Sequence, residues 1–482
     1  MFFCYIFLLL TNTIIMKNIS IWNNIKRKEY PTLKENTEVD VLIIGGGLSG
    51  ISALYHLKNT NLNVMLVEQN KLVSSTTSNS TGKLTFLQND LIDKIRKNFN
   101  NEIALKYINS QIDAINMIKE VIKLENIKCD LEQTDSIIYT NQEHEIIKLK
   151  RLEQFLNDNN FKTFKDDTNL VKSKYMFKVN NTYMFNPVKF AYGLIKNINF
   201  PIYENTSVKK IEKDNDKYIC YTDSNQIKAK FVIIASHYPY FILPFMFPIK
   251  ASLEKSYLSA SNYKGNKISL ISYSNPFISI RTYKNNLIYL SNSHSINSDT
   301  DDKKNFNELL KKVNDLNLNV NYLWSNSDIM TNDSLPYIGR LKDNIFIATG
   351  YNTWGLTNSF LSGKILKDII LNKENKYIEL FNPNRTNIKK IINTIPNTCK
   401  SIQGYIKGLK KNKNIIYEDD LMKYTIDDKE YVVKRTCPHA GCKLQFNEIE
   451  KTWDCPCHGS RFNIIGKCIC SPSNKDITVN EK

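Results

Sequence analysis

The fold of this 482-residue chain is decided by the stretch VDVLIIGGGLSG, residues 39–50. An apolar strand runs into glycines that match the pattern G-x-G-x-x-G at Gly45, Gly47 and Gly50, and the helical stretch ISALYHLKN follows. The next strand, NVMLVE, ends at Glu68. A glycine-rich turn alone is weak evidence, but a strand, turn, helix and strand in this order, closed by an acidic residue, indicate a binding site for a dinucleotide.

Each of these residue types has a physical role in holding a dinucleotide. Gly45 permits the tight turn, Gly47 lets the backbone approach the pyrophosphate, and Gly50 lets the helix pack close to the strand. The N-terminus of the helix directs N–H groups at the phosphates. Glu68 would accept hydrogen bonds from the ribose of the adenosine half. The alternative is a plain strand-to-helix turn with no ligand.

The rest of the chain is too long for one hydrophobic core, so we expect two or three domains. Isoleucines at helical spacing predict a long amphipathic helix over 103–127. The apolar run FVIIAS at the end of 203–236 predicts a buried parallel strand, and further strands are expected over 250–295. The apolar strand NIFIATG then leads into a helix expected over 356–371.

The two ends of the chain differ from its middle. Residues 1–36 are expected to form an N-terminal extension. Within it, the segment 1–15 carries an apolar run without a basic start or a cleavage site, and this segment could be a mis-assigned start of translation. Beyond Pro383 the sequence becomes rich in Lys and Asn, which predicts a helical connector over 386–412. The remainder, 413–482, is expected to be a small all-β domain.

A second glycine-bearing junction between a strand and a helix lies in ATGYNTWGLTN, residues 348–358. A nicotinamide-binding domain would not need this junction. A flavin enzyme uses such a helix N-terminus to stabilise the reduced, anionic ring. The two junctions together therefore favour FAD over NAD.

These segments, together with STTSNSTGKLT (75–85) and DSLPYIG (333–339), resemble the glycine/D-amino-acid oxidase-like flavoproteins. The resemblance covers about 37–385 and implies an α/β FAD-binding Rossmann-like domain with an α+β substrate domain. The FAD-binding segments would be about 37–85, 186–240 and 330–385. The resemblance also implies hydride transfer from a small amine or amino-acid-like donor to FAD. The FAD-binding residues that it implies are Gly45, Gly47, Gly50, Glu68, Ser75, Thr76, Thr77, Lys83, Gly350, Trp354, Gly355 and Thr357.

Residues that would act on the substrate are harder to identify. Hydride transfer needs the donor C–H placed over the flavin more than it needs a strong acid or base. Arg281, in the strand-like ISIRTY, could clamp a substrate carboxylate with two hydrogen bonds, and it could equally be an ordinary surface-strand arginine. His237 and His294 are open to a catalytic or a structural role. Neither a Ser/His/Asp set nor a pair of carboxylates stands out.

The strongest signal in the chain is CPHAGC at 437–442 followed by CPCHGS at 455–460. A [2Fe–2S] cluster with two Cys on one iron and two His on the other needs two loops that each give one sulfur and one nitrogen. The spacings C-x-H and C-x-x-H supply them. Zinc is the alternative, but a tetrahedral site needs four ligands, and this segment offers six without the usual C-x2-C pairs.

Residues 413–482 resemble the Rieske [2Fe–2S] proteins, in the variety that contains a disulfide. The ligands that the resemblance implies are Cys437 and Cys455 on one iron and His439 and His458 on the other. The disulfide that it implies joins Cys442 and Cys457. A flavin domain followed by a Rieske domain also resembles a known group of bacterial fusion oxidoreductases.

Four further residues near these loops bear on the cluster. The resemblance implies that Ser460 donates a hydrogen bond toward a cluster sulfur. Phe462 stands where many respiratory Rieske proteins carry a tyrosine. Cys468 and Cys470 are a departure from the pattern, either inert strand residues or competitors for iron during assembly.

Charge carries less information than the cysteines. The chain has 65 Lys+Arg against 48 Asp+Glu, a net charge of +17, but the lysines are spread along the whole sequence. The densest basic stretch, which holds Lys407, Lys410, Lys411 and Lys413, has too few aromatics to stack nucleic-acid bases. We therefore expect a solvated basic surface without a nucleic-acid partner. Nothing in the sequence indicates membrane association, and we expect a cytoplasmic protein.

The sequence thus predicts an FAD-dependent oxidoreductase that oxidises a small amine or amino-acid-like donor and transfers electrons through a Rieske cluster to or from an unknown partner. FAD takes two electrons as a hydride and can release them singly, whereas a [2Fe–2S] cluster carries one at a time. Three alternatives stay open: an oxidase that uses O₂ and has a redox-sensing Rieske appendage, a non-catalytic electron-transfer protein, and an RNA-modifying flavoprotein.

Overall fold

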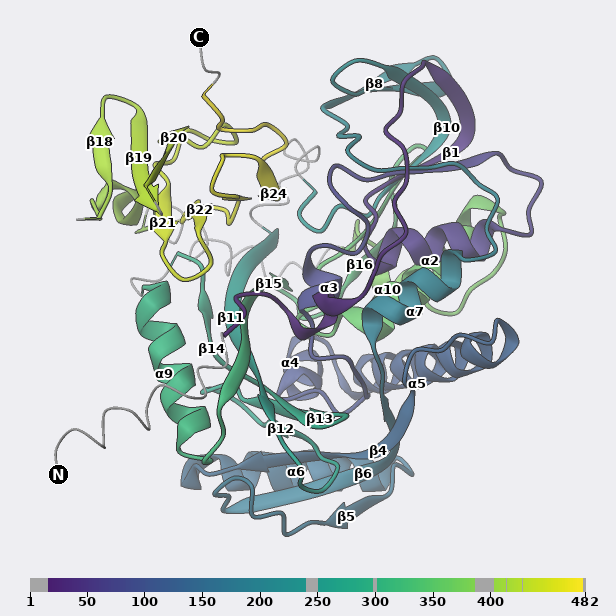
Figure 1. Cartoon of the computed structure of the whole chain (residues 1–482). Helices are drawn as coiled ribbons and strands as arrows, with labels where there is room; N and C mark the ends of the chain where they lie inside the picture. Colours follow the sequence, from purple (N-terminus) through teal and green to yellow (C-terminus); the bar gives the residue numbers. More distant parts are fainter. Residues whose placement is uncertain are drawn as a thin grey trace, which may run out of the picture.

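The structure is a computed structural model, and it describes residues 16–239, 250–297, 301–385, 403–412, 414–426 and 428–479. Two large sheets and two small ones organise this part of the chain (Figure 1). Residues 1–15 of the predicted extension and residues 386–402 of the predicted connector lie outside the described residues.

The first large sheet contains the predicted dinucleotide-binding unit. Its strands are β1 (Thr37–Ile44), β2 (Val64–Val67), β7 (Ile202–Tyr203), β8 (Lys210–Asp214), β9 (Lys217–Tyr221), β10 (Gln226–Ile234), β16 (Tyr337–Lys342) and β17 (Ile345–Thr349). The order is β16-β17-β10-β1-β2-β7, and β1 is parallel to both β10 and β2. Side chains of β1 alternate between two cores, Val41 and Ile43 on the helical side and Leu42 and Ile44 on the side of β9. Burial on both faces explains why these strands are continuously apolar.

Three helices cover one face of this sheet: α2 (Leu48–Leu57), α7 (Pro187–Ile195) and α10 (Gly355–Ile370) (Figure 1). The long helix expected over 103–127 is confirmed as α5 (Asn101–Leu124), which also contacts α10. The Asn100 side chain caps it by accepting the N–H of Ile103. Further helices are η1 (Ile21–Asn24), α3 (Thr76–Asn79), α4 (Leu91–Asn98), η2 (Glu143–Glu145), α6 (Ile146–Asp158), α9 (Asp302–Asn314) and α11 (Ile378–Phe381), and residues 403–409 are also helical.

The second large sheet is predominantly antiparallel. Its strands are β3 (Lys83–Leu84), β4 (Glu132–Thr140), β5 (Thr163–Lys165), β6 (Tyr175–Met184), β11 (Ala251–Asn262), β12 (Ser269–Ser272), β13 (Ser279–Tyr283), β14 (Asn286–Ser295) and β15 (Val320–Thr331). The order is β15-β11-β14-β13-β12-β4-β6-β3, with β5 beside β6. Helix α9 packs on β11 and β14, and α6 packs on β4 and β6. This arrangement confirms the predicted α+β second domain.

The described part of the N-terminal extension packs against both large units. Trp22 is fully buried, and its Nε1–H donates to the carbonyl oxygen of Ser80 at 2.7 Å. Nearby, the N–H of Lys17 donates to the carbonyl of Asn321 in β15 at 2.9 Å. Residues 17–24 are therefore integrated into the fold.

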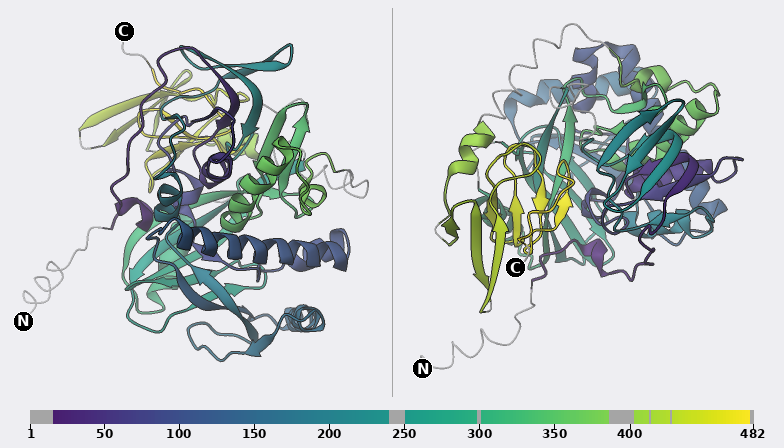
Figure 2. Two further views of the ribbon diagram at one scale, coloured as in Figure 1. Left: turned by 90° about the vertical axis from the view of Figure 1, so that its right-hand side faces the viewer. Right: turned by 90° about the horizontal axis from the view of Figure 1, so that it is seen from above.

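The C-terminal region forms the predicted all-β domain. Its strands are β18 (Ile416–Glu418), β19 (Leu421–Ile426), β20 (Lys429–Lys434), β21 (Gln445–Asn447), β22 (Thr452–Asp454), β23 (Arg461–Phe462) and β24 (Cys468–Cys470). They make one three-stranded and one four-stranded sheet around a separate core that includes Trp453 and Phe462. The domain lies at the ends of β11 and β15, and Figure 2 shows it as a body beside the large sheets.

Candidate functional site

The glycine turn after β1 has the geometry that a dinucleotide requires. Gly45 has a φ of +114°, which side chains rarely allow. A Cβ at Gly50 would lie 1.9 Å from the carbonyl oxygen of Gly45, so only glycine lets the helix approach this closely. A Cβ at Gly47 would meet only the hydroxyl of Thr77, at 3.6 Å. The backbone at Gly47 therefore faces open space that a pyrophosphate can enter.

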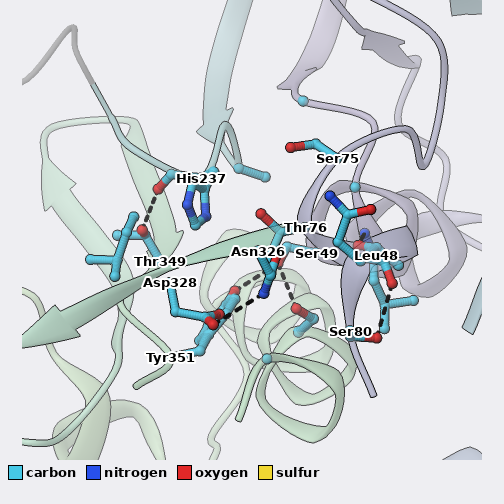
Figure 3. A pocket seen from close by; sticks show the side chains of 18 of the residues that line it. Leu48, Ser49, Ser75, Thr76, Ser80, His237, Asn326, Asp328, Thr349 and Tyr351 are labelled. Carbon is cyan, nitrogen blue, oxygen red and sulfur yellow. Dashed lines mark hydrogen bonds between the residues drawn. The ribbon is translucent and has the colours of Figure 1, made fainter. Parts of the chain in front are cut away.

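A pocket begins at this turn and extends to the second large sheet (Figure 3). Eleven of the twelve predicted FAD-binding residues line it: Gly45, Gly47, Glu68, Ser75, Thr76, Thr77, Lys83, Gly350, Trp354, Gly355 and Thr357. Gly50, the twelfth, lies against Gly45 beneath the turn. Segments as far apart in the sequence as Gly45 and Thr357 are thus brought to one cavity.

Buried polar atoms in the pocket fit a polar ligand. Five side-chain atoms that line it have no hydrogen-bond partner among the described residues: Ser207 Oγ, Ser236 Oγ, His237 Nε2, Thr353 Oγ1 and Trp354 Nε1. Native proteins rarely leave buried donors and acceptors unpaired unless a ligand or water completes them. With the open backbone at Gly47, these atoms fit FAD, which is polar along most of its length.

Glu68 lines the pocket beside the glycine turn. Its carboxylate accepts the N–H of Gly46 at 2.7 Å and the N–H of Asn70 at 2.8 Å. Burial raises the pKa of Glu68, and the nearby Glu204 adds to this effect. The predicted bond to a ribose hydroxyl stays a prediction.

Lys83 lies where the pocket meets the second sheet. Its Nζ donates to the carbonyl of Leu270 at 2.7 Å and to the hydroxyl of Ser279 at 2.9 Å. Burial holds the pKa of Lys83 well below its usual range, and the positive charge of Arg281 lowers it further. The environment therefore favours the neutral amine.

Arg281 is buried, so the interpretation of it as a surface arginine is wrong, and its hydrogen bonds do not favour the clamp for a substrate carboxylate. It is 1 % exposed and is absent from the lining of the pocket described here. Its Nη1 donates to the carbonyls of Gly82 at 2.6 Å and Phe185 at 3.1 Å, and its guanidinium lies over the Trp22 ring. Its donors hold the backbone that carries Lys83, a role that residue type alone does not reveal.

His237 and His294, whose roles the sequence leaves undecided, lie in different environments in the structure. His294 bonds Tyr257 through Nε2 at 3.0 Å and the carbonyl of Ser295 through Nδ1 at 2.8 Å, between β11, β14 and α9. It is absent from the lining of the pocket and has a structural role. His237 lines the pocket, and burial lowers its pKa to about 4. His237 is therefore neutral and can exchange hydrogen bonds with a ligand.

A pair of carboxylates that the sequence analysis missed lies in the same pocket. Glu254 in β11 and Asp328 in β15 are direct partners in the antiparallel register, and both line the cavity. Asn326 donates to Asp328 at 3.1 Å (Figure 3). Burial and the charge of Glu254 raise the pKa of Asp328 to about 7. The two acids are far apart in sequence and no motif links them, so only the strand register could have found them.

The second site is formed by the two Cys/His loops of the C-terminal domain. Cys442 and Cys457 form a disulfide with an S–S distance of 2.03 Å, which confirms the predicted pair. The thiols of Cys437 and Cys455 hydrogen bond to each other. The rings of His439 and His458 lie 5.0 Å apart, centre to centre, and are nearly perpendicular, at 83°. The structure thus brings all four predicted ligands together.

The unpaired nitrogens of the two histidines fit metal ligation. His439 Nδ1, His439 Nε2 and His458 Nδ1 are buried without a hydrogen-bond partner in the described part of the chain. Three sulfurs, those of Cys442, Cys455 and Cys457, also lie within 4.8 Å of one another. Two of these are consumed by the disulfide, so the remaining donors are one sulfur and one imidazole per loop. That donor set fits a [2Fe–2S] cluster with mixed ligands.

Residues beside the loops complete this environment. The hydroxyl of Ser460 bonds the thiol of Cys437 and accepts the N–H of Ser473 at 2.9 Å, and its predicted bond to a cluster sulfur stays a prediction. Phe462 is fully buried. Cys468 is buried and donates to the carbonyl of Ser473 at 3.1 Å, whereas Cys470 lines the pocket that begins at Gly45.

The C-terminal domain closes one side of that pocket. Ile469, Cys470 and Ser471 all line it. The hydroxyl of Ser471 donates to the carbonyl of Ser236 at 3.3 Å, directly before His237. After β14 of the second large sheet, the side-chain amide of Asn297 donates to the carbonyls of two residues in a cluster loop, Pro456 at 2.9 Å and Cys457 at 2.7 Å. The two candidate cofactor sites therefore share a contact surface.

Buried ion pairs hold this surface together. Lys255 in β11 bonds Asp454, the residue before Cys455, at 2.9 Å and Asp302 at 2.9 Å. Burial alone would lower the pKa of Lys255, but the two carboxylates outweigh it and raise the pKa, so the ammonium stays charged. On the cluster side, Arg461 pairs with Glu450 at 2.7 Å, and Glu450 also accepts the hydroxyl of Ser325 in β15 at 2.6 Å.

No helix in the described residues is long and apolar enough to cross a lipid bilayer.

Comparison with known proteins identifies the class. A family model described as FAD dependent oxidoreductase matches residues 40–369, and a Rieske [2Fe-2S] domain model matches residues 404–481. The chain belongs to the FAD-dependent oxidoreductase family and ends in a Rieske domain, which confirms FAD and a [2Fe–2S] cluster as its cofactors and makes it an enzyme.

Individual relatives agree with this assignment. A putative Rieske 2Fe-2S iron-sulfur protein, YhfW of Bacillus subtilis, is 28% identical over 484 residues, covering 93% of this chain and 94% of the relative. Gamma-glutamylputrescine oxidoreductase of Escherichia coli is 21% identical over 72% of this chain and 86% of its own. The structure of glycine oxidase from Geobacillus kaustophilus superposes with a TM-score of 0.60 at 19% identity, covering 73% of this chain and 99% of that one, and shows the same fold.

Proposed function

We propose that this enzyme oxidises a small amine or amino-acid-like donor and passes the electrons singly to its own Rieske cluster. When bound, FAD would accept a hydride from the donor and could release the two electrons one at a time. The observation that carries the proposal is the position of Ile469–Ser471, which line the same pocket as Gly45 and Gly47. A cluster domain that closes the flavin pocket suits direct transfer between the two cofactors.

The charges in the pocket support a cationic amine as the donor. Glu254 and Asp328 face one another in the lining, and a substrate ammonium would relieve the repulsion between these two half-buried carboxylates. Gamma-glutamylputrescine oxidoreductase, one of the relatives, is named for an amine-containing compound. His237 lines the same pocket, and its unpaired Nε2 is placed to bond a polar group of the substrate.

We assign Lys83 as the base that accepts a proton from the substrate ammonium. A neutral lysine amine has two N–H bonds and one lone pair. The two N–H bonds of Lys83 are donated to Leu270 and Ser279, which leaves the lone pair to accept a proton. Transfer of one proton from the substrate nitrogen to Nζ yields the neutral amine, from which a hydride can leave.

Anaerobic stopped-flow measurements test the electron route. The flavin-loaded, cluster-loaded protein is mixed with a panel of small primary and secondary amines and amino acids, and flavin bleaching and the cluster EPR signal are followed together. We expect flavin reduction first and the reduced-cluster signal second. Flavin reduction with no cluster signal, and full turnover with O₂ as the acceptor, would instead show an oxidase.

The role of Lys83 is tested through its pH profile. Without the base, only substrate that is already neutral reacts, so kcat/KM of Lys83→Met should rise about tenfold per pH unit up to the pKa of the amine itself. The wild-type profile should be nearly flat over the same range. Parallel profiles in the two proteins would contradict this role, even if the variant were slower.

A further inference from the structure

Large apolar side chains are concentrated on the described end of the connector. Residues 403–409 are helical, and Tyr405, Ile406 and Leu409 are 49%, 57% and 51% exposed. They are three of the eleven large hydrophobic side chains that are exposed in the described residues. Single exposed apolar residues need no explanation, but a group of three within one short helix indicates a contact site.

The opposite face of this helix is fixed to both cluster loops by two glycines. A Cβ at Gly404 would lie 2.5 Å from the carbonyl oxygen of Pro456 and 2.9 Å from Cα of Cys457. One turn later, a Cβ at Gly408 would lie 2.4 Å from the carbonyl oxygen of Lys443, the residue after Cys442. The helix therefore lies directly on the disulfide-linked loops, and its exposed face borders the cluster site.

The same segment is strongly basic. The sequence QGYIKGLKK, residues 403–411, contains three lysines and no acid. Arg435, which reaches the carbonyl of Leu409 at 3.5 Å and lies over the Tyr417 ring, adds a fourth cation. This is the stretch that the sequence singles out as its densest in lysine, and neither the flavin pocket nor the cluster ligands account for it. We call Tyr405, Ile406 and Leu409 with Lys410 and Lys411 the connector face; Lys407 is half-buried, and its charge acts on His294 inside the fold.

We propose that the connector face is the docking surface for a small acidic electron-carrier protein that exchanges single electrons with the Rieske cluster. The inference rests on the proposed electron transfer through the cluster and names its outside partner. An apolar centre surrounded by lysines is complementary to an acidic protein with an exposed cofactor edge, and opposite charges steer such encounters. Electron-transfer complexes are small and short-lived, which suits a surface of this size.

A membrane is the competing occupant, and the position of the helix disfavours it. Gly404 and Gly408 are packed on the two loops that carry the cluster ligands, and three apolar side chains of the same helix remain exposed. A partner on the connector face would be separated from these loops by a single helix, which suits electron transfer more than membrane attachment.

The test uses the full-length holoprotein with its cluster oxidised. Reduced plant-type [2Fe–2S] ferredoxin, an acidic carrier with a potential of about −400 mV, delivers one electron to the cluster in anaerobic stopped flow. The test variant is Lys410→Glu/Lys411→Glu. The matched control, Lys128→Glu/Lys264→Glu, changes net charge by the same amount at exposed lysines elsewhere in the fold. Because the ferredoxin bypasses the amine and Lys83, this result is independent of whether the proposed substrate is correct.

We expect the second-order rate at low salt to fall at least tenfold in the test variant and less than twofold in the control. The wild-type rate should fall with added salt, and the rate of the test variant should not. Tyr405→Ser/Leu409→Ser should weaken binding at high salt, where the charges are screened. Reduction by dithionite and the cluster EPR signal should be unchanged in every variant.

Two results would overturn the proposal. One is equal ferredoxin rates in the test and control variants. The other is co-sedimentation of the wild-type protein with vesicles of phosphatidylglycerol and phosphatidylcholine in equal parts that is lost in the test variant, which would assign the connector face to an anionic membrane surface.

Discussion

The two cofactor sites of this enzyme are built in opposite ways. The flavin pocket collects side chains from Ile44 to Ser471, from both large sheets and from the Rieske domain. The cluster site is contained in two loops between Cys437 and Ser460, joined by one disulfide. The first site depends on the whole fold, whereas the second depends on a local framework. The same difference decides how each site should respond to substitution and how well each is visible in the sequence.

The largest expected effect is loss of flavin from Gly47→Val. The turn has space for the new side chain, because a Cβ there meets only Thr77 Oγ1 at 3.6 Å, but that space is where the pyrophosphate would lie. We expect a folded protein with its cluster signal intact and almost no bound FAD, measured by absorbance after gel filtration. Gly50→Ala is the contrasting variant, since its Cβ would lie 1.9 Å from Gly45 O and should prevent folding of the domain. Full flavin content in Gly47→Val would show that this turn does not bind the pyrophosphate of the flavin.

The reciprocal substitution is His458→Ala. It should abolish the reduced-cluster EPR signal and leave the flavin spectrum unchanged, because the histidine belongs to a domain with its own core. Iron content and EPR on the purified variant measure the first effect, and the flavin absorbance measures the second. Loss of both cofactors would show that the local framework and the dispersed pocket form one folding unit.

Lys255→Met tests the contact between the two sites. It leaves Asp302 and Asp454 without their shared cation, and removing one partner of a buried ion pair costs about 3–5 kcal/mol. Urea unfolding followed by cluster absorbance should show this decrease in the free energy of unfolding. Lys255→Arg should recover part of it. Lys267→Met, which breaks an exposed pair with Glu132, should cost no more than about 1 kcal/mol. Equal costs for Lys255→Met and Lys267→Met would contradict a buried clamp.

The smallest effect is expected from Phe462→Tyr. A tyrosine hydroxyl here would donate to a cluster sulfur, and the bond is stronger in the reduced, more negative state. If the difference between the two states is about 1 kcal/mol, a one-electron potential rises by about 40 mV. Redox titration followed by EPR measures the midpoint. An unchanged or lower midpoint would mean that Phe462, which is fully buried, has only a packing role.

How much the sequence revealed follows from the same contrast. The Cys442–Cys457 pair and the proximity of Cys437, His439, Cys455 and His458 could be predicted because the two short loops carry the motifs of the Rieske resemblance. The glycine turn could be predicted because Gly45 and Gly50 are required by local geometry.

Contacts that depend on strand register or domain docking could not be predicted. Glu254 and Asp328 meet only because β11 pairs with β15 in one particular register. Arg281 was misassigned because its partners are backbone carbonyls, which carry no signal in the side-chain sequence. Cys470 had no assigned role because nothing local indicates that β24 reaches the flavin pocket.

The segment Ile469–Ser471 belongs to the same polypeptide as the pocket that it lines. A contact between separate proteins is occupied in proportion to their concentrations, but a tethered contact has an effective concentration in the millimolar range for short linkers. Dilution does not change it. The two cofactor sites therefore stay in a fixed one-to-one ratio and in contact, at any expression level of the enzyme.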